Sequence, residues 1–181
     1  MLSALAMLLF TACQPGKKVE DSSEIAKEHN DEVIDDKDEE KDADFVVNAV
    51  AASIAEINLA QLASSKSADN GVKKIAAMLE TDHTTVLHSL QGYAATNGIS
   101  VPSTETNEAK EERNDLAEKA GKDFDKEWCD KVQSSHKKNI RKFESRIDKT
   151  EDAGLKNLLS TNLSGLKNHL AMLEQHEETI K

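Results

Sequence analysis

Three histidines of this 181-residue chain interrupt apolar patterns that are typical of buried helix faces. Each replaces an apolar residue at three-four spacing: His83 between Leu79 and Val86, His136 between Val132 and Ile140, and His169 between Leu166 and Leu173. Glu56 shares a face with small and apolar residues of an earlier segment in the same way. Imidazole and carboxylate groups bind Fe, Zn, Cu or Ni, so the pattern predicts a buried metal site formed by Glu56, His83, His136 and His169.

A metal-free alternative explains the same four residues. Buried histidines also form hydrogen bonds with carboxylates, hydroxyls or carbonyl groups of neighbouring helices, and such a network can set the register of packed helices. The two hypotheses differ in one observable quantity, which is the amount of metal bound per purified chain.

Glu80 is a weaker candidate ligand, because Glu80-Thr-Asp-His83 has the Glu-x-x-His spacing of di-iron helix bundles. A second copy of this motif is absent, since Leu166 stands three residues before His169. The sequence also contains no glycine-rich phosphate loop and no Cys-x-x-Cys pair. Di-iron oxygen chemistry is therefore not expected, and no catalytic residue is assigned.

Helical periodicity, together with only 3% aromatic residues and two prolines, predicts an all-α fold. The expected helices cover residues 44–67, 71–97, 108–119, 122–150 and 155–181, separated by turns or loops that contain glycine. Two hairpins with a long middle connection predict an antiparallel four-helix bundle of ferritin-like topology. Counted from the turns, Glu56 and His83 lie at similar heights, as do His136 and His169, so each pair can meet within its hairpin.

Residues 1–13 have the features of a lipoprotein signal peptide. The first ten residues are apolar but too few to span a bilayer. Thr11-Ala12-Cys13 resembles a bacterial lipobox, in which the signal is removed and the cysteine receives a lipid. We therefore expect a membrane anchor at Cys13. The second cysteine, Cys129, then has no disulfide partner and is expected to be a buried small hydrophobic residue.

Residues 14–43 are expected to form an acidic, disordered tether ahead of a helical domain at residues 44–181. Residues 17–44 carry thirteen acidic residues against five lysines, and so most of the net charge of −11. This segment shows almost no apolar periodicity, so it has little surface to bury. A negative chain without a basic stripe is not expected to bind nucleic acid.

Several separated segments resemble a known family, the domain of unknown function numbered 4142. They are residues 42–63, Asp82-His83-Thr84, Phe124-Asp125, residues 132–136 and residues 166–170. The resemblance covers residues 42–175 and implies a ferritin-like four-helix bundle in the bacterial envelope, with no established activity. It also implies that Glu56, His83, His136 and His169 occupy matching motif positions.

The sequence therefore predicts an outer-membrane lipoprotein, anchored through Cys13 and facing the periplasm or the cell surface. Its helical domain is expected to bind a transition metal, namely Fe, Zn or Cu, for storage, buffering or stress protection. The alternative is a metal-free structural or interaction module with an envelope protein as its partner. A redox or hydrolytic enzyme is less expected, because the sequence indicates no substrate cleft.

Overall fold

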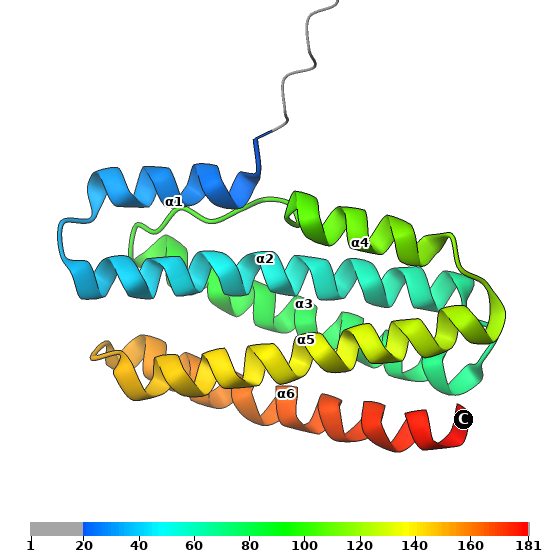
Figure 1. The fold of residues 1–181 in the computed structure, drawn as a ribbon. Helices are drawn as coiled ribbons and strands as arrows, with labels where there is room; N and C mark the ends of the chain where they lie inside the picture. The colour runs from blue at the N-terminus through cyan, green and yellow to red at the C-terminus, as the bar shows by residue number, and fades with distance from the viewer. Residues whose placement is uncertain (1–19, 181) are drawn as a thin grey trace, which may run out of the picture.

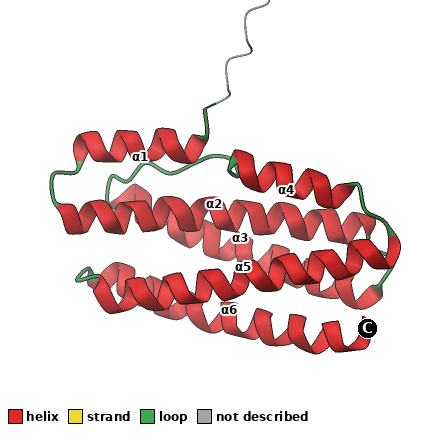
Figure 2. Ribbon diagram, in the orientation of Figure 1, coloured by secondary structure: helices red, strands yellow, loops and turns green. Residues whose placement is uncertain are grey.

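The described chain consists of six helices, four of them long (Figure 1). The structure is a computed structural model and describes residues 20–180. In chain order the helices are α1 (Ser22–Val33), α2 (Lys37–Lys66), α3 (Asn70–Thr96), α4 (Asn107–Ala117), α5 (Gly121–Lys149) and α6 (Ala153–Ile180). All regular secondary structure in residues 20–180 is helical (Figure 2), which confirms the predicted all-α class.

The four long helices pack around a common interior. α2 contacts α3 and α5, and α6 contacts the same two helices. Between α3 and α5 the chain runs back along α2 through the loop over residues 97–106 and through α4, as Figure 1 shows. The predicted long middle connection is therefore present. α1 packs on α2, and α4 packs on both α2 and α5.

The expected tether over residues 14–43 is wrong for its described part. Residues 22–33 form α1, and α2 begins at Lys37 rather than at Asp44. Asp21 and Asp36 cap the two helices, and acidic residues in the first turn of α2 suit the positive end of its dipole. α1 is held by a polar contact, since the Asn30 side chain donates to the Ser100 carbonyl (2.9 Å) and accepts from its N–H (2.8 Å). A helix held mainly by polar contacts carries no apolar stripe in its sequence.

The predicted turns lie where the helices end. The Asp69 carboxylate caps α3 by accepting from the backbone N–H groups of Gly71 and Val72, at 2.7 and 2.9 Å. After α3, Gly98 has a φ of 68°, a left-handed conformation that a residue without a Cβ adopts without strain. The Asp69 cap lies in the short turn between α2 and α3, whereas Gly98 begins the long connection after α3.

The interior contains two apolar clusters that lie one after the other along the long helices. One is centred on Leu79, Trp128, Val132 and Leu173, and the other on Leu90, Ile140, Leu159 and Leu166. His83, His136 and His169 fall between these clusters in the sequence of their helices. The structure therefore places a polar layer between two apolar ones.

Trp128 anchors the first cluster. Its side chain is fully buried, and its indole N–H donates to the Leu59 carbonyl of α2 at 2.9 Å. We expect Trp128→Phe to lower the free energy of unfolding by about 1–2 kcal/mol, because the variant loses this hydrogen bond and part of the buried ring. Urea unfolding measures this quantity, and an unchanged transition midpoint would contradict the assigned role.

α2 is the one helix in residues 20–180 that is long and apolar enough, by length and composition alone, to cross a membrane. Half of its most apolar 18-residue window is buried inside the protein. Helices in the core of a folded domain have the same features, so the packing of α2 explains its composition.

Candidate metal centre

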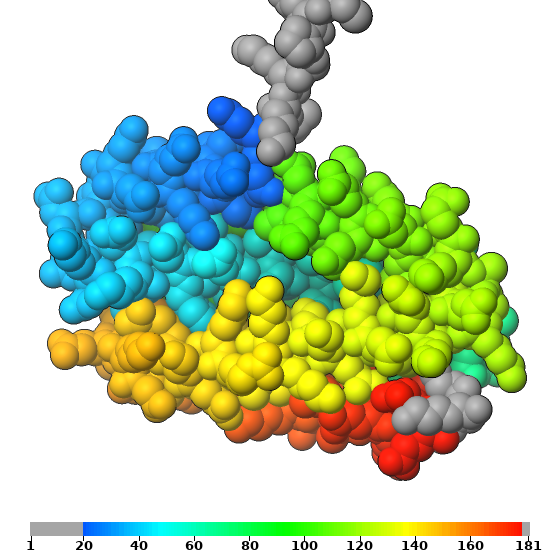
Figure 3. Space-filling view, viewed as in Figure 1, coloured from blue at the N-terminus to red at the C-terminus, as the bar shows by residue number. Residues whose placement is uncertain are grey.

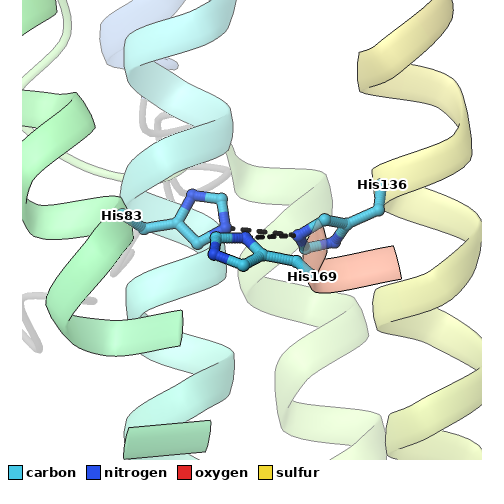
Figure 4. Close-up of side chains that lie close together, drawn as sticks. All are labelled: His83, His136 and His169. Carbon is cyan, nitrogen blue, oxygen red and sulfur yellow. Dashed lines mark hydrogen bonds between the residues drawn. The ribbon is translucent and has the colours of Figure 1, made fainter. Parts of the chain in front are cut away.

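Three imidazoles from three different helices converge in the interior, as Figure 4 shows. His83 Nε2 lies 3.4 Å from His136 Nε2, and His136 Nε2 lies 3.3 Å from His169 Nδ1. One nitrogen of each ring lies within 4.8 Å of the other two. Each residue is 3% exposed or less. The structure thus brings together three of the four residues that the sequence analysis selected.

Hydrogen bonds on the outer side of two rings determine which nitrogen carries the proton. His136 Nδ1 lies 2.9 Å from the Val132 carbonyl, which can only accept, so Nδ1 donates. His169 Nε2 lies 2.9 Å from the Asp82 carboxylate and donates to it in the same way. In the neutral form of each ring, the nitrogen that faces the centre is therefore the one without a proton.

The inward nitrogens of His136 and His169 present two lone pairs to each other at 3.3 Å, which is not a hydrogen bond between neutral rings. Neutral His83 carries a single proton, on either Nε2 or Nδ1, so it donates at most one hydrogen bond to these inward nitrogens. Its Nδ1 is buried and has no hydrogen-bond partner in the structure. The centre thus has a surplus of acceptors, and a cation would satisfy them.

Burial keeps the three rings neutral. It lowers the pKa of His136 to about 4 and that of His83 well below the usual value, and the neighbouring imidazoles lower the latter further. Burial also lowers the pKa of His169, although the hydrogen bond to Asp82 opposes this shift. Neutral imidazole is the form that binds metal, so all three rings are ready to act as ligands at neutral pH.

Glu56 adjoins the three histidines but does not face their inward nitrogens. Its Oε1 lies 3.7 Å from Nδ1 of His136, the outer nitrogen that already bonds to Val132. The side chain is buried, and burial raises its pKa to about 7, against the opposing effects of the Ser135 hydroxyl and of His169. The predicted four-residue group is therefore a three-histidine group with a carboxyl beside it, because Glu56 approaches from behind the His136 ring.

Glu80, the weaker candidate ligand, does not contact the histidines, whereas Asp82 two residues later does. Glu80 accepts a hydrogen bond from Gln61 at 2.9 Å and lies outside the histidine group. Asp82 is half exposed, yet it orients His169 through the 2.9 Å contact. From the sequence, Asp82 could either support a histidine ligand or be an exposed helix acid, and the second was preferred. In the structure it is half exposed and also bonds to His169.

Cys129 is not a member of this centre. Cys129 is buried, as predicted, and burial raises its pKa to about 12, with further contributions from nearby carboxylates such as Asp125. A thiol with so high a pKa is a poor nucleophile at neutral pH. Cys13, the expected lipidation site, lies outside the described residues together with the signal peptide.

These features define an all-helical protein with a buried three-histidine group between two apolar layers. The family model described as Domain of unknown function (DUF4142) matches residues 28–176, and the chain belongs to this family. The match begins inside α1, which agrees with a folded region longer than the expected domain at residues 44–181. The searches of curated proteins and of solved structures gave no match.

Proposed function

We propose that the chain is a lipid-anchored protein of the bacterial envelope whose ferritin-like four-helix bundle binds one transition-metal ion. His83, His136 and His169 are the ligands, and Zn²⁺ is the ion that suits them best, ahead of Fe and Cu. The function of such a site is metal storage, buffering or protection from metal stress. The observation that carries the proposal is the convergence of three neutral imidazoles whose inward nitrogens share too few protons.

The distances between the ligand atoms favour tetrahedral coordination. Two nitrogens bound to a tetrahedral Zn²⁺ at about 2.0–2.1 Å lie about 3.3–3.4 Å apart. The two contacts that involve His136 measure 3.4 and 3.3 Å. Two of the three nitrogen pairs therefore already have the spacing of zinc ligands, and the ligand nitrogens of the third pair, His83 and His169, lie within 4.8 Å of each other.

The outer hydrogen bonds support the same conclusion. Histidine ligands commonly donate their second N–H to a carboxylate or a backbone carbonyl, which fixes the ring orientation and raises its basicity. Asp82 serves His169 in this way, and the Val132 carbonyl serves His136. A hydrogen-bonded core network needs no such arrangement of bare nitrogens.

Elemental analysis tests the proposal directly. A tag-free protein covering residues 20–181 contains every described helix, and it is purified without chelator, then loaded with Zn²⁺ and desalted. We expect about one metal ion per chain, lost in His136→Gln and retained in His88→Ala. His88 is exposed on α3 and lies outside the group, so it is the matched control.

A folded wild-type protein that retains no Zn²⁺, Fe²⁺ or Cu⁺ would overturn the metal proposal. The three histidines would then form a structural network, and the search for a function would turn to protein partners in the envelope. Circular dichroism of each variant ensures that a loss of metal is not a loss of fold.

Asp82 offers a finer test. We expect Asp82→Ala to weaken zinc affinity about 10–100-fold, because His169 loses the carboxylate that orients it. Competition against a chromophoric zinc chelator measures this affinity. Glu80→Ala is the control two residues away on the same helix. An equal loss in Glu80→Ala would mean that the effect of Asp82→Ala comes from the lost negative charge and not from the contact with His169.

The anchor needs a separate test, because it rests on residues 1–13. Full-length protein expressed in a bacterial host with a labelled fatty acid should incorporate label and sediment with the membranes. Cys13→Ala should be unlabelled. A wild-type protein that stays unlabelled would contradict the lipoprotein assignment without affecting the metal site.

A further inference from the structure

A cavity of about 500 Å³ opens between α2 and α5, and His83 of the histidine centre forms part of its inner wall. α2 presents small side chains to this cavity, namely Ala49, Ala52 and Ser53, which leave space between the two helices. Val86 of α3 and Leu166 of α6 form part of its wall. In Figure 3, the N-terminal half of α2, which lines this cavity, lies between α1 and α5. The volume falls in the range of natural ligand pockets.

The side chains around the cavity are strongly basic, although the chain as a whole carries a net charge of −11. Six Lys or Arg residues line it against one acidic residue, Asp44. Two of the six already have partners, since Arg146 pairs with Asp42 and Lys41 with Asp38. The other four form no ion pair within residues 20–180, and all are exposed: Lys138, Arg141, Lys142 and Lys149.

The like charges also act on one another. Burial lowers the pKa of Lys142, and the nearby ammonium groups of Lys138 and of Lys27 on α1 lower it further. Four cations without ion-pair partners among the described residues, against the single carboxylate of Asp44, give the rim a positive potential that attracts anions. The cluster therefore points to a negatively charged occupant.

The inner wall is apolar. Phe45 and Phe143 meet edge to face with their ring centroids 5.2 Å apart, and Val86, Leu166 and Ala49 extend this apolar surface. The buried polar residues that line the cavity with them are Ser53 and His83. An inorganic anion would leave the apolar groups unused, whereas an apolar chain would cover them. A ligand that uses the whole cavity therefore has two parts, an anionic group at the basic rim and an apolar group against the inner wall.

We propose that this cavity binds an amphiphilic anion, a single carboxylate or phosphate head on one unbranched apolar chain. The head contacts the basic rim, chiefly Lys138 and Lys142, and the chain lies against Phe45 and Phe143. A fatty acid and a monoalkyl phosphate share this chemistry. The site is distinct from the histidine group in its ligand, and its test needs no metal.

Isothermal titration of the metal-free protein with decanoate, decyl phosphate, decanol and inorganic phosphate tests both parts of the ligand. We expect saturable binding of at least one of the two anions, at least tenfold tighter than decanol. Shortening the chain should weaken binding about fourfold per methylene until it vanishes. Decanoate alone binding would identify a carboxylate site, and decyl phosphate alone a phosphate site. Inorganic phosphate binding as tightly as decyl phosphate would reduce the site to a free-anion site and overturn the proposal.

Variants locate the site. Replacing both Lys138 and Lys142 by Ala should weaken binding at least tenfold. Replacing Lys122 and Lys126 by Ala, two exposed lysines of the same helix outside the cavity, makes the same charge change and should leave binding unaltered. Ala52→Phe should fill the space and abolish binding. Equal affinity in the two lysine pairs, or decanol binding as tightly as decanoate, would overturn the proposal even if Ala52→Phe fails to fold.

Discussion

Zinc in thousandfold excess over its dissociation constant should stabilise the metal-free protein by about 4 kcal/mol, because an ion that binds only the folded state shifts the unfolding equilibrium by mass action. For a chain of this size the shift corresponds to a rise of about 10 °C in the melting temperature. The reason lies in the centre itself, where the inward nitrogens of His136 and His169 face each other at 3.3 Å without a proton between them. Thermal unfolding followed by circular dichroism measures the change.

Two controls separate site binding from general effects of the ion. Mg²⁺ prefers oxygen ligands and should leave the melting temperature unchanged at equal concentration. His169→Asn should lose most of the zinc effect, whereas His88→Ala should keep it. Equal stabilisation of all three proteins by Zn²⁺ would place the ion elsewhere on the surface, for which the many exposed carboxylates offer sites.

The histidine centre was largely predictable from the sequence for a physical reason. A histidine that replaces an apolar residue of a helical stripe faces the interior, and counting residues from a turn gives its height along the bundle. Both arguments hold for His83, His136 and His169. The stripe gives the helix face on which a side chain lies, and the residue count gives its depth along the bundle. Side chains that face the interior at the same depth can meet.

The exact position of the Glu56 carboxyl does not follow from helix face and depth alone. Its height and face were as predicted, but the final approach depends on side-chain rotamers and on the rotation of each helix. These placed its carboxyl behind His136, 3.7 Å from the outer nitrogen. Asp82 was expected to be an exposed acid because it lies off the apolar stripe, yet this half-exposed residue of α3 reaches His169 on α6.

The helix α1 was missed because its stabilisation is polar and distant in sequence. Asn30 bonds to Ser100, seventy residues away, and no local pattern indicates such a pairing. Residues 14–43 were expected to be disordered because their charge density is high. Some of these acidic residues instead cap α1 and α2 or lie in their first turns. Composition predicts whether a segment can form a core of its own, but it does not predict docking on an existing one.

Glu56→Gln should stabilise the metal-free protein by up to about 3 kcal/mol at pH 8, and by much less at pH 5. In the folded state burial raises the pKa of Glu56 to about 7, from 4.5 in the unfolded chain. Between these values the folded state binds more protons than the unfolded state, so the contribution of Glu56 to stability falls as the pH rises and reaches its lowest value above pH 7. Glutamine is neutral and similar in shape, so it removes this penalty.

Urea unfolding of wild type and Glu56→Gln at pH 5 and pH 8 measures the difference, in which the shared titration of the histidines cancels. Glu111→Gln, on the exposed surface of α4, is the control and should change stability little at either pH. Bound Zn²⁺ places positive charge near the carboxyl and lowers its pKa, so the gain from Glu56→Gln should shrink in the loaded protein. A variant no more stable than wild type at pH 8 would mean that a buried imidazolium already neutralises Glu56, which is the state that a metal-free histidine network requires.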